Sequence, residues 1–349
     1  MNMNLVTSLI VLITVSTVAA WPTWNNIFKA DLKSKYDDKV NVKEKFVEPT
    51  KENKGQKEIP IPSHCGRSKY GKRQKRIVGG ESSRFGEWPW LINMRRQVVF
   101  NSSTYNSSMP YMYGCGGSLI HPQWVLTAAH CFWGLEGDNL GDFDTSHPEH
   151  WMMRIGEHNM LDDNATHVDV PVEKIYLHPN WTNFLITPVI DIALVKLSYP
   201  TTLTENVNVV CLPDEADLDK VQPGRHCMVA GWGWTKDRKY RNGSLPSDVL
   251  QHAKLPIVKP DVCNTTIYGE YNLTIYKDEI CFNAEATIGT CQGDSGSPVV
   301  CYDKEDERYV QMGIVSRGGT CGEEPGIFTK VNSYIDWIED TLQADGEKY

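Results

Sequence analysis

The prediction of fold class and function starts from three short stretches that lie far apart along this chain of 349 residues. The first is 289–298, GTCQGDSGSP, whose glycines let the backbone turn sharply and present Ser295 outward. The second, 126–131, contains His130, and the third, 191–195, opens an apolar, strand-like run with an aspartate. Each stretch alone is typical of an ordinary turn or strand end. Together they supply an imidazole, a carboxylate and an alcohol in the order His, Asp, Ser.

These three residue types define one chemistry. A serine hydroxyl becomes a nucleophile when an imidazole takes its proton during attack. The imidazole in turn needs a carboxylate that fixes its tautomer and stabilises the imidazolium. We therefore predict His130, Asp191 and Ser295 as catalytic residues for acyl transfer, with the backbone N–H groups of Gly293 and Ser295 binding the developing oxyanion.

Further motifs extend this pattern over most of the chain. They are IVGG at 77–80, WPW at 88–90, CGGSLI at 115–120, LTAAHC at 126–131, AGWG at 230–233 and PGIFTKV at 325–331. With the Ser295 loop, they resemble the chymotrypsin-like family of serine endopeptidases from Ile77 to the C-terminus. The resemblance implies an all-β fold of two six-stranded antiparallel β-barrels, with the site in the cleft between them. Apolar residues at 335, 338 and 342 have helical spacing and predict a C-terminal α-helix capped by Ser333.

Two segments are expected before this domain, which we place at 77–349. Residues 5–20 are apolar, too short to cross a bilayer comfortably and end in small residues, which favours a signal peptide over 1–20. An uncleaved membrane anchor is the alternative. Residues 21–76 are lysine-rich and lack periodic apolar positions, so we expect a basic, mostly disordered propeptide.

The charge of the chain is unevenly distributed. Residues 1–76 hold 15 Lys and Arg against 7 Asp and Glu, and residues 77–349 hold 20 against 37. The second part therefore has no basic patch suited to nucleic acid. We expect a secreted, extracellular protein with no stable membrane insertion.

Activation is predicted from the residues RQKR at 73–76, which directly precede Ile77. A multibasic run is often only a solvated loop. The resemblance implies instead a zymogen, cut after Arg76 by an activating protease, whose new ammonium at Ile77 pairs with the carboxylate of Asp294.

The ten cysteines indicate an oxidising compartment, and the absence of Cys-x-x-Cys pairs argues against zinc. Spacing alone leaves the connectivity open. The resemblance implies four bridges in the domain and a fifth that tethers the leader: Cys115–Cys131, Cys227–Cys301, Cys263–Cys281, Cys291–Cys321 and Cys65–Cys211.

Seven N-glycosylation sequons are present, at Asn101, Asn106, Asn164, Asn180, Asn242, Asn264 and Asn272. The segment 157–167 stands where some relatives bind calcium, but Asn164 and His167 replace the expected glutamates. We predict no metal there and no cofactor for the reaction.

The resemblance implies that substrate preference is set by a pocket formed at Gly289, Gly318 and Gly326. Without a fixed charge, this open pocket predicts an apolar P1 side chain, as in chymotrypsin-like or elastase-like enzymes. Three departures from the family pattern leave other outcomes open: Arg317 beside the substrate strand, Ser297 in place of a glycine, and a short loop carrying Glu323 and Glu324. The two glutamates would favour a basic P1 residue, whereas Arg317 would favour acidic residues outside P1. Ser316 is expected to bond Asp191 from behind.

The sequence thus predicts a secreted serine endopeptidase made as a zymogen. Its partners would be protein or peptide substrates, the activating protease, and serpin-type or other protease inhibitors. Two alternatives remain, a trypsin-like protease using Glu323 and Glu324, and a catalytically silent homologue that acts as a binding protein.

Overall fold

The structure is a computed structural model of the chain, and it describes residues 64–71, 81–97, 111–132, 147–162, 167–181, 190–220, 222–235, 246–266, 275–282 and 289–345. These residues all belong to one unit of the chain, Glu58–Tyr349. No helix within those ranges is both long and apolar enough to span a membrane.

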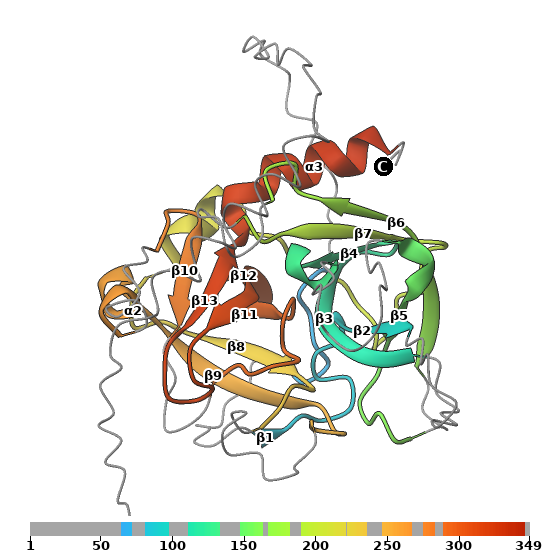
Figure 1. Cartoon of the computed structure of the whole chain (residues 1–349), viewed down its shortest axis with the longest axis horizontal. Coiled ribbons are helices and arrows are strands. Elements are labelled where there is room, and N and C mark those ends of the chain that lie inside the picture. The colour runs from blue at the N-terminus through green and yellow to red at the C-terminus, as the bar shows by residue number, and fades with distance from the viewer. Residues whose placement is uncertain are drawn as a thin grey trace, which may run out of the picture. The chain divides into compact units, whose positions relative to one another are not determined.

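Six strands close into a first antiparallel barrel (Figure 1), paired in the order β2-β3-β4-β7-β6-β5. They are β2 (Leu91–Gln97), β3 (Tyr111–His121), β4 (Trp124–Thr127), β5 (Trp151–Ile155), β6 (Val168–Leu177) and β7 (Ala193–Leu197). Residues along β5 alternate between buried and half-buried, as expected for a strand with one face in a core. That core contains the almost completely buried Trp90, Trp124 and Trp151.

A second antiparallel barrel follows, in the order β9-β10-β13-β12-β11-β8, and a β8–β9 pairing closes it. Its strands are β8 (His226–Gly231), β9 (Gln251–Val258), β10 (Glu279–Phe282), β11 (Pro298–Asp303), β12 (Arg308–Gly318) and β13 (Gly326–Lys330). The short strand β1 (Glu81–Ser82) pairs antiparallel with the start of β9. The predicted fold of two six-stranded barrels is confirmed.

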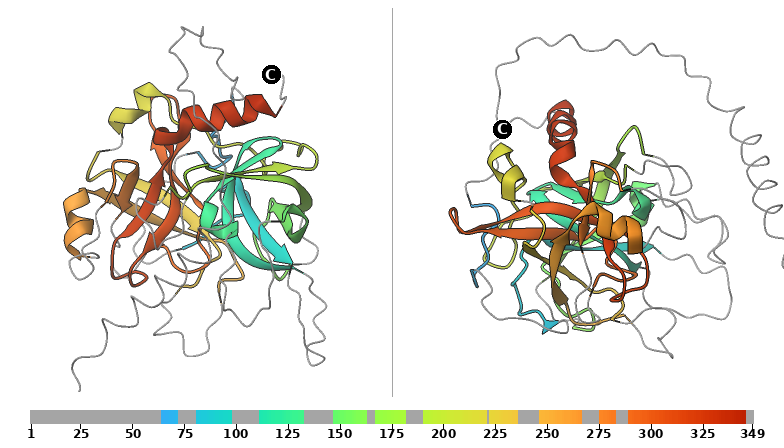
Figure 2. Two further views of the ribbon diagram at one scale, coloured as in Figure 1. Left: turned by 45° about the horizontal axis from the view of Figure 1, so that its top comes forward. Right: turned by 90° about the vertical axis from the view of Figure 1, so that its left-hand side faces the viewer.

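The barrels lie side by side (Figures 1 and 2) and are joined by polar contacts. Ser118 of β3 donates to the side chain of Gln311 of β12 at 2.6 Å, and both residues are fully buried. The backbone N–H of Gly116 donates to the carbonyl of Ser295 at 2.7 Å. The loop that carries Ser295 is therefore attached to the opposite barrel.

The C-terminal helix α3 (Ile335–Ala344) exists as predicted, but the expected cap is wrong. A 3₁₀ helix, Val331–Tyr334, precedes α3, so the N-cap position falls on Tyr334 and no side chain caps the helix. Ile338 and Leu342 are buried, in agreement with the apolar spacing. The carboxylate of Asp345, directly after the helix, contacts Lys196 and Tyr176 of the first barrel.

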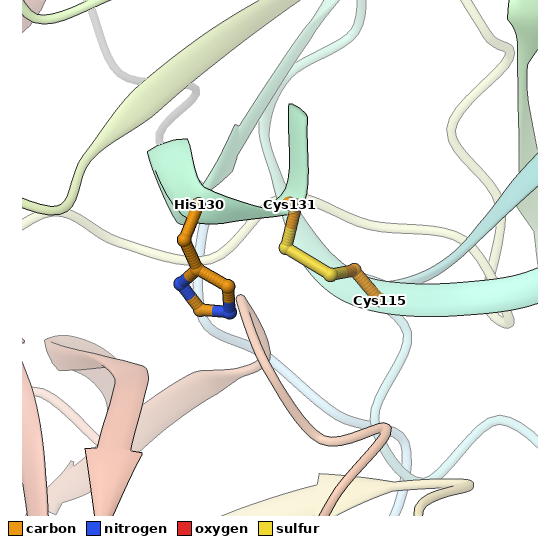
Figure 3. Close-up of side chains that lie close together, drawn as sticks. All are labelled: Cys115, His130 and Cys131. Carbon is orange, nitrogen blue, oxygen red and sulfur yellow. A yellow bond between two sulfur atoms is a disulfide. The ribbon is translucent and has the colours of Figure 1, made fainter. Parts of the chain in front are cut away.

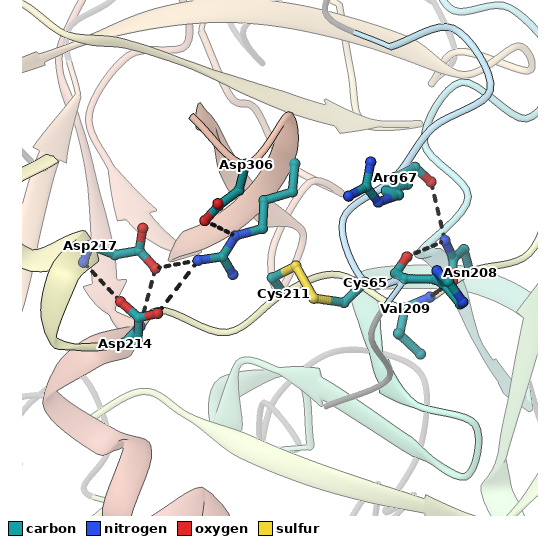
Figure 4. Close-up of a disulfide and its surroundings, with 10 residues drawn as sticks. Cys65, Arg67, Asn208, Val209, Cys211, Asp214, Asp217 and Asp306 are labelled. Atoms are coloured by element: carbon teal, nitrogen blue, oxygen red, sulfur yellow. Dashed lines mark hydrogen bonds and ion pairs between the residues drawn. A yellow bond between two sulfur atoms is a disulfide. The ribbon is translucent and has the colours of Figure 1, made fainter. Parts of the chain in front are cut away.

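The described residues contain five disulfides, and they are the pairs that the resemblance implies: Cys65–Cys211, Cys115–Cys131, Cys227–Cys301, Cys263–Cys281 and Cys291–Cys321. Cys65 belongs to a segment, 64–71, that also binds the domain through its backbone. Gly66 donates to Val209 and accepts from Tyr309, each at 2.8 Å. The side chain of Asn208 donates to the carbonyls of His64 and Arg67 (Figure 4).

Several predicted features lie outside the described residues. These are the signal peptide, the propeptide up to residue 63, the cleavage site Arg76–Ile77, and the sequons at Asn101, Asn106, Asn164, Asn242 and Asn272. Of the two remaining sequons, Asn180 is exposed in a turn. Asn264 lies in helix α2 (Pro260–Thr266), where its side-chain oxygen accepts the N–H of Ile275 at 2.9 Å.

Candidate active site

Ser295 lies on the tight loop that leads into β11. Gly293 and Gly296 flank it with φ of 99° and 79°, a region that side chains rarely adopt. A side chain at Gly296 would also clash with Thr127 Oγ1 and the carbonyl of Gly116. The loop therefore packs directly on the end of β4, close to the turn that carries His130.

His130 sits in a 3₁₀ helix, Ala129–Phe132, that follows β4. Its backbone N–H donates to Asp191 Oδ1 at 2.9 Å, and its ring Nδ1 lies 2.7 Å from Asp191 Oδ2. Two contacts to one carboxylate fix both the backbone and the ring of this histidine. The structure thus brings together His130 and Asp191, which are separated by 61 residues.

Asp191 is fully buried immediately before β7. Ser316 Oγ donates to Asp191 Oδ2 at 2.6 Å, as predicted. The β12–β13 register shifts between Val315 and Arg317, and such a bulge can re-aim a side chain. Burial opposes ionisation of Asp191, but the charge of His130 and the hydrogen bonds from His130 and Ser316 outweigh it, so the pKa lies below its usual value.

A disulfide lies next to the histidine (Figure 3). The sulfur atoms of Cys115 and Cys131 and a ring nitrogen of His130 all lie within 4.8 Å of one another. Because the two sulfurs are bonded to each other, they offer no thiolates to a metal ion. The bridge instead ties the His130 turn to β3.

A cavity of about 230 Å³ opens beside Ser295. It contains all three pocket glycines predicted from the sequence, Gly289, Gly318 and Gly326. Gly318 and Gly326 face each other across β12 and β13, and a Cβ on Gly318 would lie 3.4 Å from the Gly326 Cα. Apolar side chains also line it: Leu255, Phe282, Val315 and Phe328. The cavity is therefore open and lined by both apolar and polar residues.

Two ionisable residues line the same cavity, and both are already engaged. Arg317 forms an ion pair with the buried Glu279 of β10 at 2.6 Å. The carboxylate of Glu324 accepts the backbone N–H of Thr320 and lies over Gly319. No local pattern in the sequence pointed to Glu279, because its contact with Arg317 crosses the intervening strand β13.

Asp294 is half-buried behind the Ser295 loop. Its two oxygens accept the N–H groups of Gly233 at 2.9 Å and Cys291 at 3.0 Å. Burial nevertheless raises its pKa to about 6, against the effect of those two bonds. A second cavity of about 240 Å³ lies against this carboxylate and is also lined by Trp234, Gln251 and His252.

In the segment that lacks the expected glutamates, Glu157 is satisfied by neighbouring protein groups. Glu157 is buried and pairs with Arg154 at 3.2 Å, with His167 Nδ1 at 3.7 Å and with the N–H of His158 at 2.7 Å. The carboxylate is thus compensated by protein groups. Asn164 lies outside the described residues.

Ser297, the predicted departure in the nucleophile loop, is fully buried. Its Oγ has no hydrogen-bond partner among the described residues. A Cβ on Gly116 would clash with that oxygen, so the two residues pack tightly across the barrel junction.

Comparison with protein families agrees with this geometry. A family model described as Trypsin matches residues 77–338. With the two barrels, this shows that the chain belongs to the trypsin family of chymotrypsin-like serine proteases.

Proposed function

We propose that the chain is the zymogen of a secreted serine endopeptidase that acts through an acyl-enzyme. In this mechanism His130 takes the proton from Ser295 Oγ, which attacks a peptide carbonyl. The N–H groups of Gly293 and Ser295 stabilise the oxyanion, and His130 then protonates the leaving amine. Water attacks the acyl-enzyme with His130 again as base, which releases the second product and restores Ser295.

The observation that carries this proposal is the pair of contacts between His130 and Asp191 beside the Ser295 loop. A carboxylate kept ionised by its partners favours the imidazolium that forms during proton transfer. We expect a fluorophosphonate to label the processed protein at Ser295, with Ser295→Ala as the control. If the folded, processed protein were not labelled, the alternative of a silent binding homologue would be correct.

We further propose that P1 is apolar. The three glycines and the four apolar side chains of the cavity offer no floor charge to a basic side chain. Of the two glutamates on which the trypsin-like alternative rests, Glu323 and Glu324, it is Glu324 that lines this cavity among the residues that the structure describes. A scan of P1 substrates separates them: fastest cleavage after Phe, Tyr or Leu supports the first proposal, and after Arg or Lys the second.

Activation is proposed to follow from cleavage after Arg76. The new ammonium of Ile77 would reach Asp294, whose buried carboxylate lacks a compensating cation among its hydrogen-bond donors. Pairing stabilises such a buried charge strongly. The fragment that ends at Arg76 would remain attached through Cys65–Cys211, and electrophoresis should release it only after reduction.

The remaining proposals concern the rest of the chain and its surroundings. We propose a signal peptide over 1–20, a basic propeptide over 21–76 and the protease domain over 77–349. Five disulfides support an extracellular location. Protein or peptide substrates and serpin-type inhibitors are the expected partners. Mass spectrometry after glycosidase treatment would identify which of the seven sequons carry glycans.

A further inference from the structure

Both peptide planes next to Gly293 are held by groups from other segments. The carbonyl of Gln292 accepts the N–H of Trp234 at 2.9 Å. In a trans peptide the C=O and N–H point in opposite directions, so this bond directs the Gly293 N–H away from Trp234. On the other side, the carbonyl of Gly293 accepts the hydroxyl of Tyr113.

Gly293 is also enclosed sterically. A Cβ at this position would lie 3.0 Å from the Gly233 Cα and 3.4 Å from Tyr113 Cε1. The tyrosine ring and the Gly233 backbone therefore approach the glycine closely. Because glycine has more backbone freedom than other residues, such contacts restrict a position that would otherwise be mobile.

Tyr113 is itself well supported. It lies on β3, and its ring meets that of Trp232 edge to face, with centroids 6.0 Å apart. Trp232 is fully buried, and its Nε1 donates to the carbonyl of His158 at 3.2 Å. Burial, and then the charge of Asp294, raise the pKa of Tyr113 well above its usual value. The hydroxyl therefore stays protonated and remains a donor at neutral and alkaline pH.

We propose that Tyr113 is a positioning residue for the oxyanion site. Its hydroxyl holds the carbonyl of Gly293, and this orients the N–H of the same residue before substrate binds. The inference rests on the proposed function, in which the Gly293 N–H is an oxyanion donor. Donors fixed in advance stabilise a transition state more than donors that must reorganise. Tyr113 does not touch the reacting atoms and acts through Gly293.

The test compares Tyr113→Phe with Tyr199→Phe in the full chain, processed after Arg76. Tyr199 is a matched control, because its hydroxyl also donates to a backbone carbonyl, that of Asp169 at 3.4 Å, on the exposed surface. We expect Tyr113→Phe to lower kcat about tenfold, less than the roughly 100-fold loss typical of removing an oxyanion donor outright. KM should stay unchanged, and Tyr199→Phe should match the wild type.

A second readout separates positioning from a merely structural role. A peptidyl trifluoromethyl ketone forms a hemiketal with the catalytic serine, and NMR reports the pKa of its oxygen. A tenfold weaker oxyanion site raises that pKa by about one unit. Equal kcat and equal hemiketal pKa in Tyr113→Phe and the wild type would overturn the inference.

The outcomes for the two proposals are distinguishable. If neither the wild type nor Tyr199→Phe reacts with a fluorophosphonate, the proposed function itself fails. If Tyr113→Phe does not fold, as judged by its thermal unfolding, a fluorinated tyrosine at position 113 retains the ring and the hydroxyl. Fluorine lowers the pKa of the phenol despite the nearby charge of Asp294, so the hydroxyl stops donating at a lower pH than in the wild type. Activity should therefore fall at a lower alkaline pH, and an alkaline limb of the pH–activity profile that is unchanged from the wild type would contradict the inference.

Discussion

Ser316 Oγ lies 2.6 Å from Asp191 Oδ2, the same oxygen that lies 2.7 Å from His130 Nδ1. The other oxygen of this carboxylate accepts the backbone N–H of His130 at 2.9 Å. These three contacts engage both carboxylate oxygens, so the carboxylate cannot rotate without losing a hydrogen bond. Asp191 therefore has one orientation, and it is the one that serves the imidazole.

Replacing Ser316 by alanine should weaken catalysis by releasing one side of Asp191. A hydrogen bond to a charged group contributes roughly 1.5 kcal/mol, which corresponds to about a tenfold lower kcat/KM. Steady-state kinetics of the processed enzyme would measure this loss. Ser333→Ala, an exposed serine before α3, is the control and should leave kcat/KM unchanged. An equal effect of both substitutions would show that the Ser316 bond is not used.

Asp294 should make the stability of the uncleaved chain depend on pH. Burial raises its pKa from 3.8 to about 6, so the folded state favours the protonated acid. The resulting stability is complete below about pH 4 and is lost as pH rises through about 6. At 1.36 kcal/mol per unit, the free energy of unfolding should fall by about 3 kcal/mol across this window.

The measurement is urea unfolding of the uncleaved chain between pH 4 and pH 7, with Arg76→Gln to prevent processing. Asp294→Asn should flatten the dependence in this range, because it removes the titrating group. The two proteins are compared by how steeply the free energy of unfolding changes with pH. Its absolute value is not compared, because the asparagine amide at position 294 has one acceptor oxygen fewer than the carboxylate. Parallel curves for the two proteins would contradict the assignment.

Two buried serines should respond in opposite ways to the same substitution. Ser297 and Ser118 are both fully buried, but Ser118 donates to Gln311, whereas Ser297 Oγ has no partner in the described part of the chain. Ser297→Ala removes an unsatisfied hydroxyl and should stabilise the fold by about 1 kcal/mol. Ser118→Ala leaves Gln311 without its donor and should destabilise by about 1–2 kcal/mol. Denaturant midpoints measure both, and destabilisation by Ser297→Ala would show that its hydroxyl is satisfied.

Gly318→Val should change the P1 preference from large to small side chains. The new side chain would stand opposite Gly326 and fill the cavity beside Ser295. We expect kcat/KM for a substrate with Phe at P1 to fall about 100-fold, and kcat/KM for one with Ala at P1 to change little. Each methylene group that a pocket accepts or rejects changes the discrimination between substrates by about 1–3 kcal/mol. The ratio of kcat/KM for the two substrates serves as an internal control. If Gly318→Val left this ratio unchanged, the P1 side chain would bind outside this cavity.

The candidate catalytic residues were predictable because each lies in a local motif. The turn at Gly293–Gly296 and the run ending in Cys131 are defined by neighbouring residues, so His130 and Ser295 could be identified from the sequence. Ser316 was expected behind Asp191 on the same resemblance, and the structure shows the contact. The expected cap at Ser333 was wrong, because a 3₁₀ turn that sequence spacing does not reveal shifts the start of α3 to Ile335.

The sequence by itself determined the chemical residue types, which lie in short local motifs, and through the family resemblance of those motifs it also predicted the barrel fold and the glycine pocket. Only the tertiary structure decided which distant groups hold them in place. Tyr113 meets Gly293 across 180 positions, Glu279 neutralises Arg317 across an intervening strand, and Ser297 packs against Gly116 of the other barrel. Such contacts depend on strand register and barrel closure, which place residues together without leaving a local pattern in the chain.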